Sequence, residues 1–281
     1  IAHTFELLRN GPQFKQIGRQ KGGEVRIAPL QICQYDSGSR MRILVVSDIH
    51  YSLRQFDWLS EVCSDWDLLI IAGDLMELAC SVDPDTQAAV VEQYFRKISQ
   101  RTPLVVCSGN HDLIEDYEGV RSNEWLEDLA IPGLTVDRGL YENEHLRILS
   151  LPWWETEEEK ARAAAFLDAQ YRPDDGRPVF WVHHAPPLGA KTSWNGKRDL
   201  GDRTLVEWIG KYSPNLVLSG HVHNAPYYAE GSWIDRVGET VVINGGRQTG
   251  DRPATVEIEV ENGSLVWCGM EGCEKASLAT V

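Results

Sequence analysis

Five short apolar segments of the chain are each followed by residues that can bind metal ions or move protons. Asp48 and His50 follow the segment 43–46, and Asp74 follows the segment 68–72. Three later apolar segments are followed by the rest of this group: Asn110, His111, Asp112, His183, His184, His221 and His223. The carboxyl ends of parallel strands meet in one crevice, where open α/β sheets bind their ligands. The sequence therefore predicts carboxylates, imidazoles and an amide gathered at a single site.

These ligand types match divalent ions of intermediate hardness. Carboxylate and amide oxygens combined with several imidazoles favour Mn, Fe, Zn or Co, and no cysteine stands among them as in many structural zinc sites. Even seven ligands from this group would exceed the needs of one tetrahedral ion and would suit two ions that share a bridging carboxylate. Gly73, Gly109 and Gly220 adjoin the ligands and allow sharp turns and close backbone approach. The residues thus predict two divalent transition-metal ions.

The elements that must position these residues alternate between strand and helix. Runs of apolar and β-branched residues predict strands at 41–47, 67–72, 104–107, 145–151, 179–182, 216–218, 240–244, 254–260 and 265–268. Apolar residues three and four positions apart predict helices at 53–64, 84–98, 156–170 and 204–211. Two of these helices carry capping signals: Asp83 before Pro84, and the pair Thr156 and Glu159. This alternation indicates an α/β domain with a largely parallel sheet.

Composition limits the class of protein. The 281 residues are 42% hydrophobic and 25% charged, as in packed globular chains. The net charge of −15 argues against a nucleic-acid polymer as partner, because such binding depends on Lys and Arg contacts to phosphates. The sequence has no apolar run of the roughly 18 residues that span a membrane, and its first residues lack the apolar core of a secretory signal. We therefore expect a cytoplasmic protein with no membrane partner; the sequence indicates no oligomeric state.

The cysteines form no C-x-x-C pair: Cys33, Cys63, Cys80, Cys107, Cys268 and Cys273. In a chain of this length without a secretion signal, they are expected to be reduced thiols. Cys107 ends an apolar segment and is expected to be a small buried residue.

The order of the motifs D-x-H, G-D, G-N-H-D, H-x-P and G-H-x-H resembles the calcineurin-like metallophosphoesterases over residues 41–260. The resemblance implies an α/β fold with a two-sheet β-sandwich core flanked by helices and a dinuclear metal site at the C-terminal ends of the strands. Residues 1–40 are then an N-terminal extension of unknown role, with one expected strand at 24–32. Residues 261–281 are a C-terminal strand and tail.

Carried over position by position, the resemblance also implies the role of each site residue. The ligands of the first ion are Asp48, His50 and His223, those of the second are Asn110, His184 and His221, and Asp74 bridges both. The family places a ligand two residues before the proline of H-x-P, which selects His184 over its neighbour His183. His183 then points to the opposite face of its strand. His111 would act at the phosphoryl group, and Asp112 would orient it.

The implied activity is hydrolysis of a small phosphorylated substrate by in-line attack of a hydroxide that bridges the two ions. The short insertions and the His-Ala-Pro-Pro sequence at 184–187 resemble the small bacterial phosphodiesterase-type members of the family, which implies a small phosphodiester or a cyclic nucleotide as substrate. A protein Ser/Thr phosphatase would read G-D-x-x-D-R-G from Gly73, and this chain does not. Two alternatives stay open, a phosphomonoesterase of the same fold and a non-catalytic metal-binding scaffold. Scaffold relatives lose metal ligands, whereas all seven are present here.

The connection 185–203 follows His184 and combines cations with an aromatic residue. Trp194 and Arg198 are predicted to contact the substrate, because a cation and an aromatic ring can hold a phosphate and stack on a flat leaving group. The alternative is a solvated loop whose basic residues pair with acidic neighbours. Trp153 and Trp154 follow another strand and either line the site or pack in the core.

Overall fold

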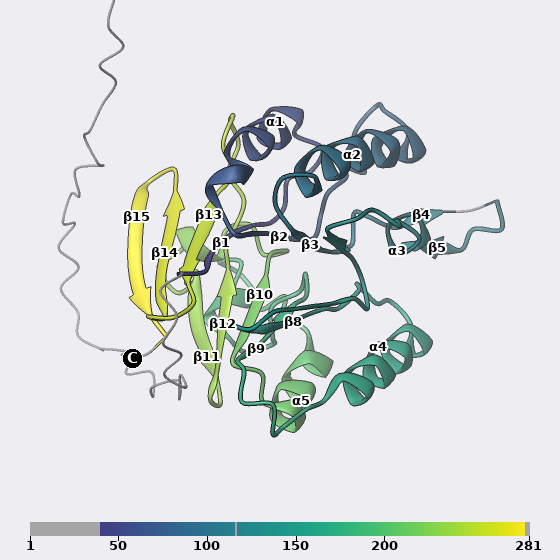
Figure 1. The fold of residues 1–281 in the computed structure, drawn as a ribbon. Helices are drawn as coiled ribbons and strands as arrows, with labels where there is room; N and C mark the ends of the chain where they lie inside the picture. Colours follow the sequence, from purple (N-terminus) through teal and green to yellow (C-terminus); the bar gives the residue numbers. More distant parts are fainter. Residues whose placement is uncertain (1–39, 116, 279–281) are drawn as a thin grey trace, which may run out of the picture.

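The computed structural model describes residues 40–115 and 117–278, which form two β-sheets and the helices around them (Figure 1). The first sheet contains, in order, β15 (Gly272–Ser277), β14 (Ser264–Gly269), β13 (Thr255–Glu259), β1 (Arg42–Val46), β2 (Leu68–Ala72), β3 (Leu104–Cys107) and β6 (Leu134–Thr135). The second contains β11 (Ile234–Val237), β12 (Thr240–Asn244), β10 (Leu216–Ser219), β9 (Val179–Val182), β8 (Arg147–Ser150) and β7 (Leu140–Glu142). A separate hairpin pairs β4 (Ile114–Glu115) with β5 (Arg121–Ser122).

Each sheet has a parallel centre and antiparallel margins. Strands β1, β2, β3 and β6 are parallel, as are β8, β9, β10 and β12. Strands β13, β14 and β15 continue the first sheet in antiparallel pairing, and β7 and β11 close the second. The parallel arrangement that the sequence predicted is therefore confirmed at the centre of each sheet.

Apolar side chains on both faces of the strands build a layered molecule. Ile43 and Val45 lie in the cluster between the two sheets, whereas Leu44 and Val46 lie in the cluster under the helices. This follows from the two-residue period of a strand. Helices α1 (Leu53–Val62) and α2 (Pro84–Ser99) cover the first sheet; α4 (Glu157–Gln170) and α5 (Arg203–Tyr212) cover the second (Figure 1). The predicted two-sheet sandwich flanked by helices is confirmed.

The helices begin where the capping signals predicted. Asp83 accepts a hydrogen bond from the backbone N–H of Thr86 at 2.9 Å, with Pro84 at the first helical position. Thr156 and Glu159 form the complete capping box of α4. The remaining helical segments are α3 (Glu124–Glu127) and three 3-10 turns, η1 (Cys63–Asp65), η2 (Lys191–Ser193) and η3 (Ala225–Tyr227). Among the described residues, no helix has both the length and the apolarity needed to cross a bilayer.

Several elements have no counterpart in the prediction: β4, β5, β6, β7, β11, β15 and α3. Most are two to four residues long, too short for periodicity to show, and β15 is a polar strand at the sheet edge. The expected strand at 24–32 lies outside the described residues, as does most of the extension 1–40. The domain boundaries stay predictions.

The prediction of reduced cysteines is wrong for one pair. Cys268 and Cys273 form a disulfide, because β14 and β15 place them directly opposite each other with their Cα atoms 4.1 Å apart. Cys63, Cys80 and Cys107 are free, and Cys107 is buried as predicted. Cys33 lies outside the described residues.

Candidate metal centre

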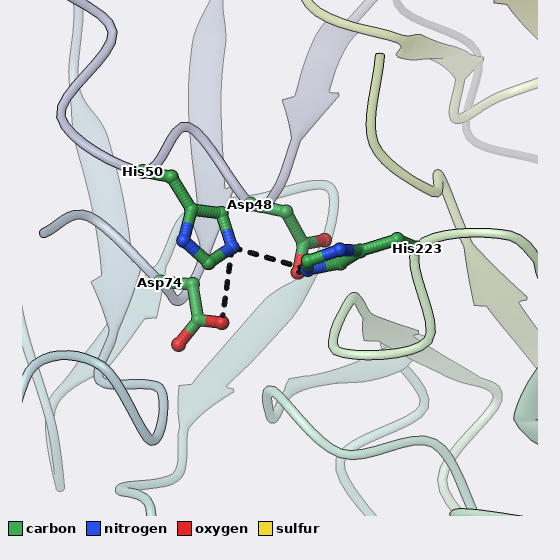
Figure 2. A group of neighbouring side chains, drawn as sticks. All are labelled: Asp48, His50, Asp74 and His223. Atoms are coloured by element: carbon green, nitrogen blue, oxygen red, sulfur yellow. Dashed lines mark hydrogen bonds and ion pairs between the residues drawn. The ribbon is translucent and has the colours of Figure 1, made fainter. Parts of the chain in front are cut away.

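The carboxyl ends of five parallel strands bring the predicted ligands together. Asp48 and His50 follow β1, Asp74 follows β2, and His223 follows β10. Asn110 follows β3, and His184 follows β9. Figure 2 shows the first four of these side chains pointing toward one another.

The first group consists of the three ligands predicted for one ion and the predicted bridge. His50 Nε2 lies 3.3 Å from Asp74 Oδ2 and 3.1 Å from His223 Nε2 (Figure 2). His223 Nε2 in turn lies 3.2 Å from Asp48 Oδ1. One ligand atom from each of these four residues lies within 4.8 Å of those of the other three. Two carboxylate oxygens and two imidazole nitrogens thus surround a space of the size that one cation needs.

The second group adjoins the first through Asp74. His184 Nε2 lies 3.1 Å from Asp74 Oδ2, the same oxygen that faces His50. The rings of His184 and His221 have centroids 5.3 Å apart, and His221 Nδ1 lies 2.8 Å from Asn110 Oδ1. One carboxylate oxygen therefore lies between two sets of imidazoles. The structure brings together all seven side chains that the sequence assigned to metal; their role as ligands stays a prediction.

Tight turns hold the ligands at the strand ends. Asp48, His50, Asp74 and His221 have positive φ angles of 54°, 47°, 54° and 66°. Such angles cost non-glycine residues roughly 1–2 kcal/mol each, so the surrounding structure must enforce them. For Asp48, His50 and Asp74, backbone hydrogen bonds between the turns after β1 and β2 do so, from Asp48 N–H to Gly73 O at 3.0 Å and from His50 N–H to Asp74 O at 2.9 Å.

Electrostatics set the protonation states of the predicted ligands. Burial alone would raise the pKa of Asp74, but the imidazole of His184 outweighs it and holds this pKa below its usual range. Burial lowers the pKa values of His50 and His221 to about 4 each. Burial also disfavours the charged form of His184, yet Asp74 raises its pKa to about 9. Asp74 is therefore ionised and two imidazoles are neutral near pH 7, while His184 carries a proton that a cation would displace.

The donor set and its supports fit divalent cations. His184 Nδ1 lies 2.7 Å from the carbonyl oxygen of Ala72, which fixes the ring so that Nε2 faces Asp74. An imidazole whose second nitrogen is held by a carbonyl oxygen is the usual arrangement of a metal-binding histidine. His50 Nδ1 similarly lies 3.3 Å from Glu77 Oε2.

Glu77 belongs to the site although the sequence did not single it out. Its Oε1 lies 3.5 Å from His111 Nδ1, so this carboxylate faces both His111 and His50. The available signal was an acidic residue three positions after Asp74, in the loop that follows a strand. A single carboxylate in an exposed loop is too common a feature to indicate function by itself.

Asp112 acts on the backbone around the site. Its buried carboxylate accepts hydrogen bonds from the N–H groups of Leu75 and Met76 at 2.8 and 2.9 Å and from Gly109 at 2.7 Å. Burial, and then the charge of Asp74, raises its pKa to about 8. Asp112 thus joins the loop after β2 to the loop after β3, which carries Asn110 and His111.

The two adjacent histidines occupy different layers. His183 stacks on Trp154 with ring centroids 3.9 Å apart, while His184 faces the carboxylates. Trp153 lies beside the second group, its ring centroid 5.2 Å from that of His221 and 5.8 Å from that of His184. Of the two tryptophans, Trp154 packs in the core and Trp153 lines the site.

The predicted substrate residues lie in a small hairpin. Trp194 pairs with Asp199, and Asn195 Oδ1 accepts hydrogen bonds from the N–H groups of Lys197 and Arg198 at 2.9 Å each. The contacts that the structure shows for Trp194 and Arg198 are with this loop, not with the metal ligands. Their contact with substrate stays a prediction.

Comparisons with known proteins agree with this geometry. The family model of the calcineurin-like phosphoesterases matches residues 41–225. TT1561 of Thermus thermophilus is 16% identical, with a TM-score of 0.53 over 85% of this chain and 100% of its own. The purple acid phosphatase PPD1 from yellow lupin (Lupinus luteus) seeds is 15% identical, with a TM-score of 0.52 over 86% of this chain and 52% of its own. These two likenesses show the fold alone, and a comparison with curated proteins finds no match. Because the family model matches more than half of this chain, the chain belongs to the calcineurin-like phosphoesterase family.

Proposed function

We propose that this protein hydrolyses a small phosphodiester, such as a cyclic nucleotide, at the centre around Asp74. The family supports metal-dependent hydrolysis of phosphoesters in general. The observation that carries the proposal is the position of Asp74 Oδ2, within 3.3 Å of His50 Nε2 and 3.1 Å of His184 Nε2. A carboxylate between two sets of imidazoles is the arrangement expected of a bridging ligand.

The chain supplies ligands for two ions of Mn, Fe, Zn or Co. Asp48, His50 and His223 would hold one ion, Asn110, His184 and His221 a second, and Asp74 both. When bound, such ions polarise a phosphoryl oxygen and lower the pKa of an attacking water. Asp112 supports the ligands indirectly, because it ties together the two loops that carry Asp74 and Asn110.

His111 is the proposed proton donor to the leaving oxygen. Its backbone N–H donates to Asp74 Oδ1 at 2.9 Å, which places the residue at the edge of the centre. Its side chain is 25% exposed, and Glu77 faces Nδ1, so Nε2 is the nitrogen left for a substrate. A general acid at this place accelerates departure of a poor leaving group.

The experiment is a comparison of metal-stripped and reloaded protein on a panel of esters. Protein loaded with Mn, Fe(II), Zn or Co is assayed on bis-p-nitrophenyl phosphate, p-nitrophenyl phosphate and a cyclic nucleotide. We expect turnover only after loading, with kcat/KM about tenfold or more higher on the diesters than on the monoester, a difference of about 1.4 kcal/mol. Preference for the monoester would favour the phosphomonoesterase, and bound metal without turnover on any ester would favour the scaffold.

The same panel tests His111. His111→Ala should keep its metal and lose roughly 10²- to 10⁴-fold in rate on the cyclic nucleotide, an alkyl ester whose leaving oxygen needs a proton, with a smaller loss on p-nitrophenyl esters, whose leaving group needs none. An unchanged rate on the alkyl ester would remove the proposed role.

A further inference from the structure

Arg247 lies at the rim of the metal centre, in the loop that follows β12. Its backbone N–H donates to the carbonyl oxygen of His223 at 3.0 Å, so a ligand residue and Arg247 are joined directly. Its guanidinium Nη2 lies 3.7 Å from Glu77 Oε2, and 31% of its side chain is exposed. Arg247 is therefore a cation beside the predicted ligands that solvent can still reach.

Glu77 lies between Arg247 and two histidines of the centre, His50 and His111. One of its oxygens faces His50 Nδ1 at 3.3 Å and Arg247 at 3.7 Å, and the other faces His111 Nδ1 at 3.5 Å. Glu77 thus faces two partly exposed side chains, His111 and Arg247, beside one predicted ligand histidine. Arg247 and His111 therefore lie close to the same predicted ligand histidine.

The loop that carries Arg247 is held from both sheets. Asn244 donates to the carbonyl oxygens of Val222 and Thr192 at 3.1 and 2.9 Å, and its Oδ1 accepts from the N–H of Gly246 at 2.8 Å. From the first sheet, the indole N–H of Trp267 donates to the carbonyl oxygen of Gly245 at 2.9 Å. A backbone held in this way fixes the point from which the side chain of Arg247 extends at the edge of the centre.

The guanidinium of Arg247 also makes fewer hydrogen bonds than that of Arg121. Arg121 donates to Glu155 at 3.0 Å and to the carbonyl oxygen of Asn110 at 3.1 Å. Within residues 40–115 and 117–278, the one ion pair of Arg247 is the contact with Glu77, which at 3.7 Å is longer than a hydrogen bond. Its N–H groups are therefore available to an anion.

We infer that Arg247 is a substrate-binding residue that donates hydrogen bonds to oxygens of the phosphate group, from a place beside the carboxylate of Glu77. This inference rests on the proposed function. The planar guanidinium matches two phosphate oxygens at once, and bonds between a charged donor and a charged acceptor are among the strongest in proteins. Loss of such a pair weakens binding about tenfold to hundredfold.

The test measures binding of inorganic phosphate, the group that substrates and product share, to the metal-loaded full chain. Arg247→Met removes the charge but keeps a side chain of similar length. Arg247→Lys keeps the charge but loses the planar guanidinium that can bond two phosphate oxygens at once. Arg54→Met is the matched control. Arg54 is an exposed arginine of α1, and it pairs with Asp251, which lies in the same loop as Arg247. Calorimetry gives the phosphate affinity, elemental analysis gives the metal content, and steady-state kinetics separate KM from kcat.

We expect Arg247→Met to weaken phosphate binding about tenfold to hundredfold and to raise KM in parallel, with full metal content. Arg247→Lys should recover part of the loss, and Arg54→Met should match the wild type. Unchanged phosphate affinity and KM in Arg247→Met would overturn the inference while wild-type hydrolysis leaves the proposed function intact. Loss of metal in Arg247→Met would also overturn it, since Arg247 would then support the ligands. A wild type that binds phosphate through Arg247 but hydrolyses no ester would overturn the proposed function alone.

Discussion

His183 and His184 show how much one position along a strand decides at the residue scale. Successive side chains of a strand point to opposite faces, so one imidazole faces the carboxylates and the other faces Trp154. Their pKa values diverge accordingly. Burial lowers the pKa of His183 to about 4, whereas Asp74 overcomes the same effect and raises that of His184 to about 9.

The two histidines should therefore respond differently to mutation. His184→Ala should lose bound metal and should lower kcat/KM by more than the tenfold to hundredfold typical of an outer-shell partner. His183→Phe should keep its metal, because a phenyl ring preserves the stack on Trp154. Elemental analysis and the ester assay measure both effects. The reverse ranking would move the ligand to His183.

Turn geometry decides the site at the scale of the elements. Gly73 joins β2 to Asp74 with a φ of +80°, and a Cβ atom there would lie 2.5 Å from His184 Nδ1. The turn after β3 is equally crowded, because a Cβ on Gly109 would lie 2.3 Å from Asp74 Oδ1. Three strand ends approach one another this closely only because these two residues lack side chains.

A matched pair of glycine variants separates crowding from backbone strain. Gly73→Ala and Gly238→Ala both place alanine at a positive φ, but nothing lies within 4 Å of a Cβ on Gly238. We expect Gly238→Ala to cost roughly 1–2 kcal/mol of unfolding free energy and to keep its metal. Gly73→Ala should lower the free energy of unfolding by more than this and should lose metal, because His184 must move. Denaturant unfolding and elemental analysis give both quantities, and equal effects in the two variants would contradict the proposed packing.

A buried polar network joins the two sheets at the scale of the whole molecule. Asp137 accepts hydrogen bonds from Ser108 N–H at 2.9 Å and from Asn123 Nδ2 at 2.6 Å. Ser108 follows β3 of the first sheet, and its Oγ accepts from the N–H of Trp153, which follows β8 of the second, at 2.9 Å. Burial outweighs these hydrogen bonds and raises the pKa of Asp137 to about 6.

This raised pKa makes stability depend on pH with a definite sign. Folding favours the protonated form of Asp137. The contribution of this proton to the stability of the fold is complete below pH 3.8, the ordinary pKa, and is lost as the pH rises through about 6, the pKa in the folded protein. Asp137→Asn cannot ionise. The free energy of unfolding of this variant, relative to that of the wild type, should therefore rise by up to about 3 kcal/mol between about pH 4 and pH 7.

Urea unfolding at several pH values measures this difference. Asp175→Asn is the control of opposite sign, because a hydrogen bond from Arg177 lowers the pKa of Asp175 to about 2. Relative to the wild type, the free energy of unfolding of Asp175→Asn should fall as the pH rises from about 2 to about 4. A difference for Asp137→Asn that stays constant with pH would show that Asp137 is ionised throughout.

Local patterns in the sequence determined the main strands, the helix starts and the class of site. The run 68–72 matches β2, and the capping residues Asp83 and Thr156 mark the starts of α2 and α4. These features depend on neighbours within a few positions, so the sequence alone carries them. The seven predicted ligands were recognisable because each follows an apolar segment within a few positions and because the order of their motifs resembles the family.

Only the tertiary structure decided which distant residues meet. Glu77 and Arg247 are separated by 170 positions along the chain, yet they lie 3.7 Å apart, because β2 and β12 end at the same edge of the sandwich. The disulfide between Cys268 and Cys273 likewise depends on the register of β14 and β15. Short strands such as β6 form because a neighbouring strand offers hydrogen bonds, not because their own residues prefer the extended state. Pairing across the sheets is a property of the whole packed chain, and no local pattern encodes it.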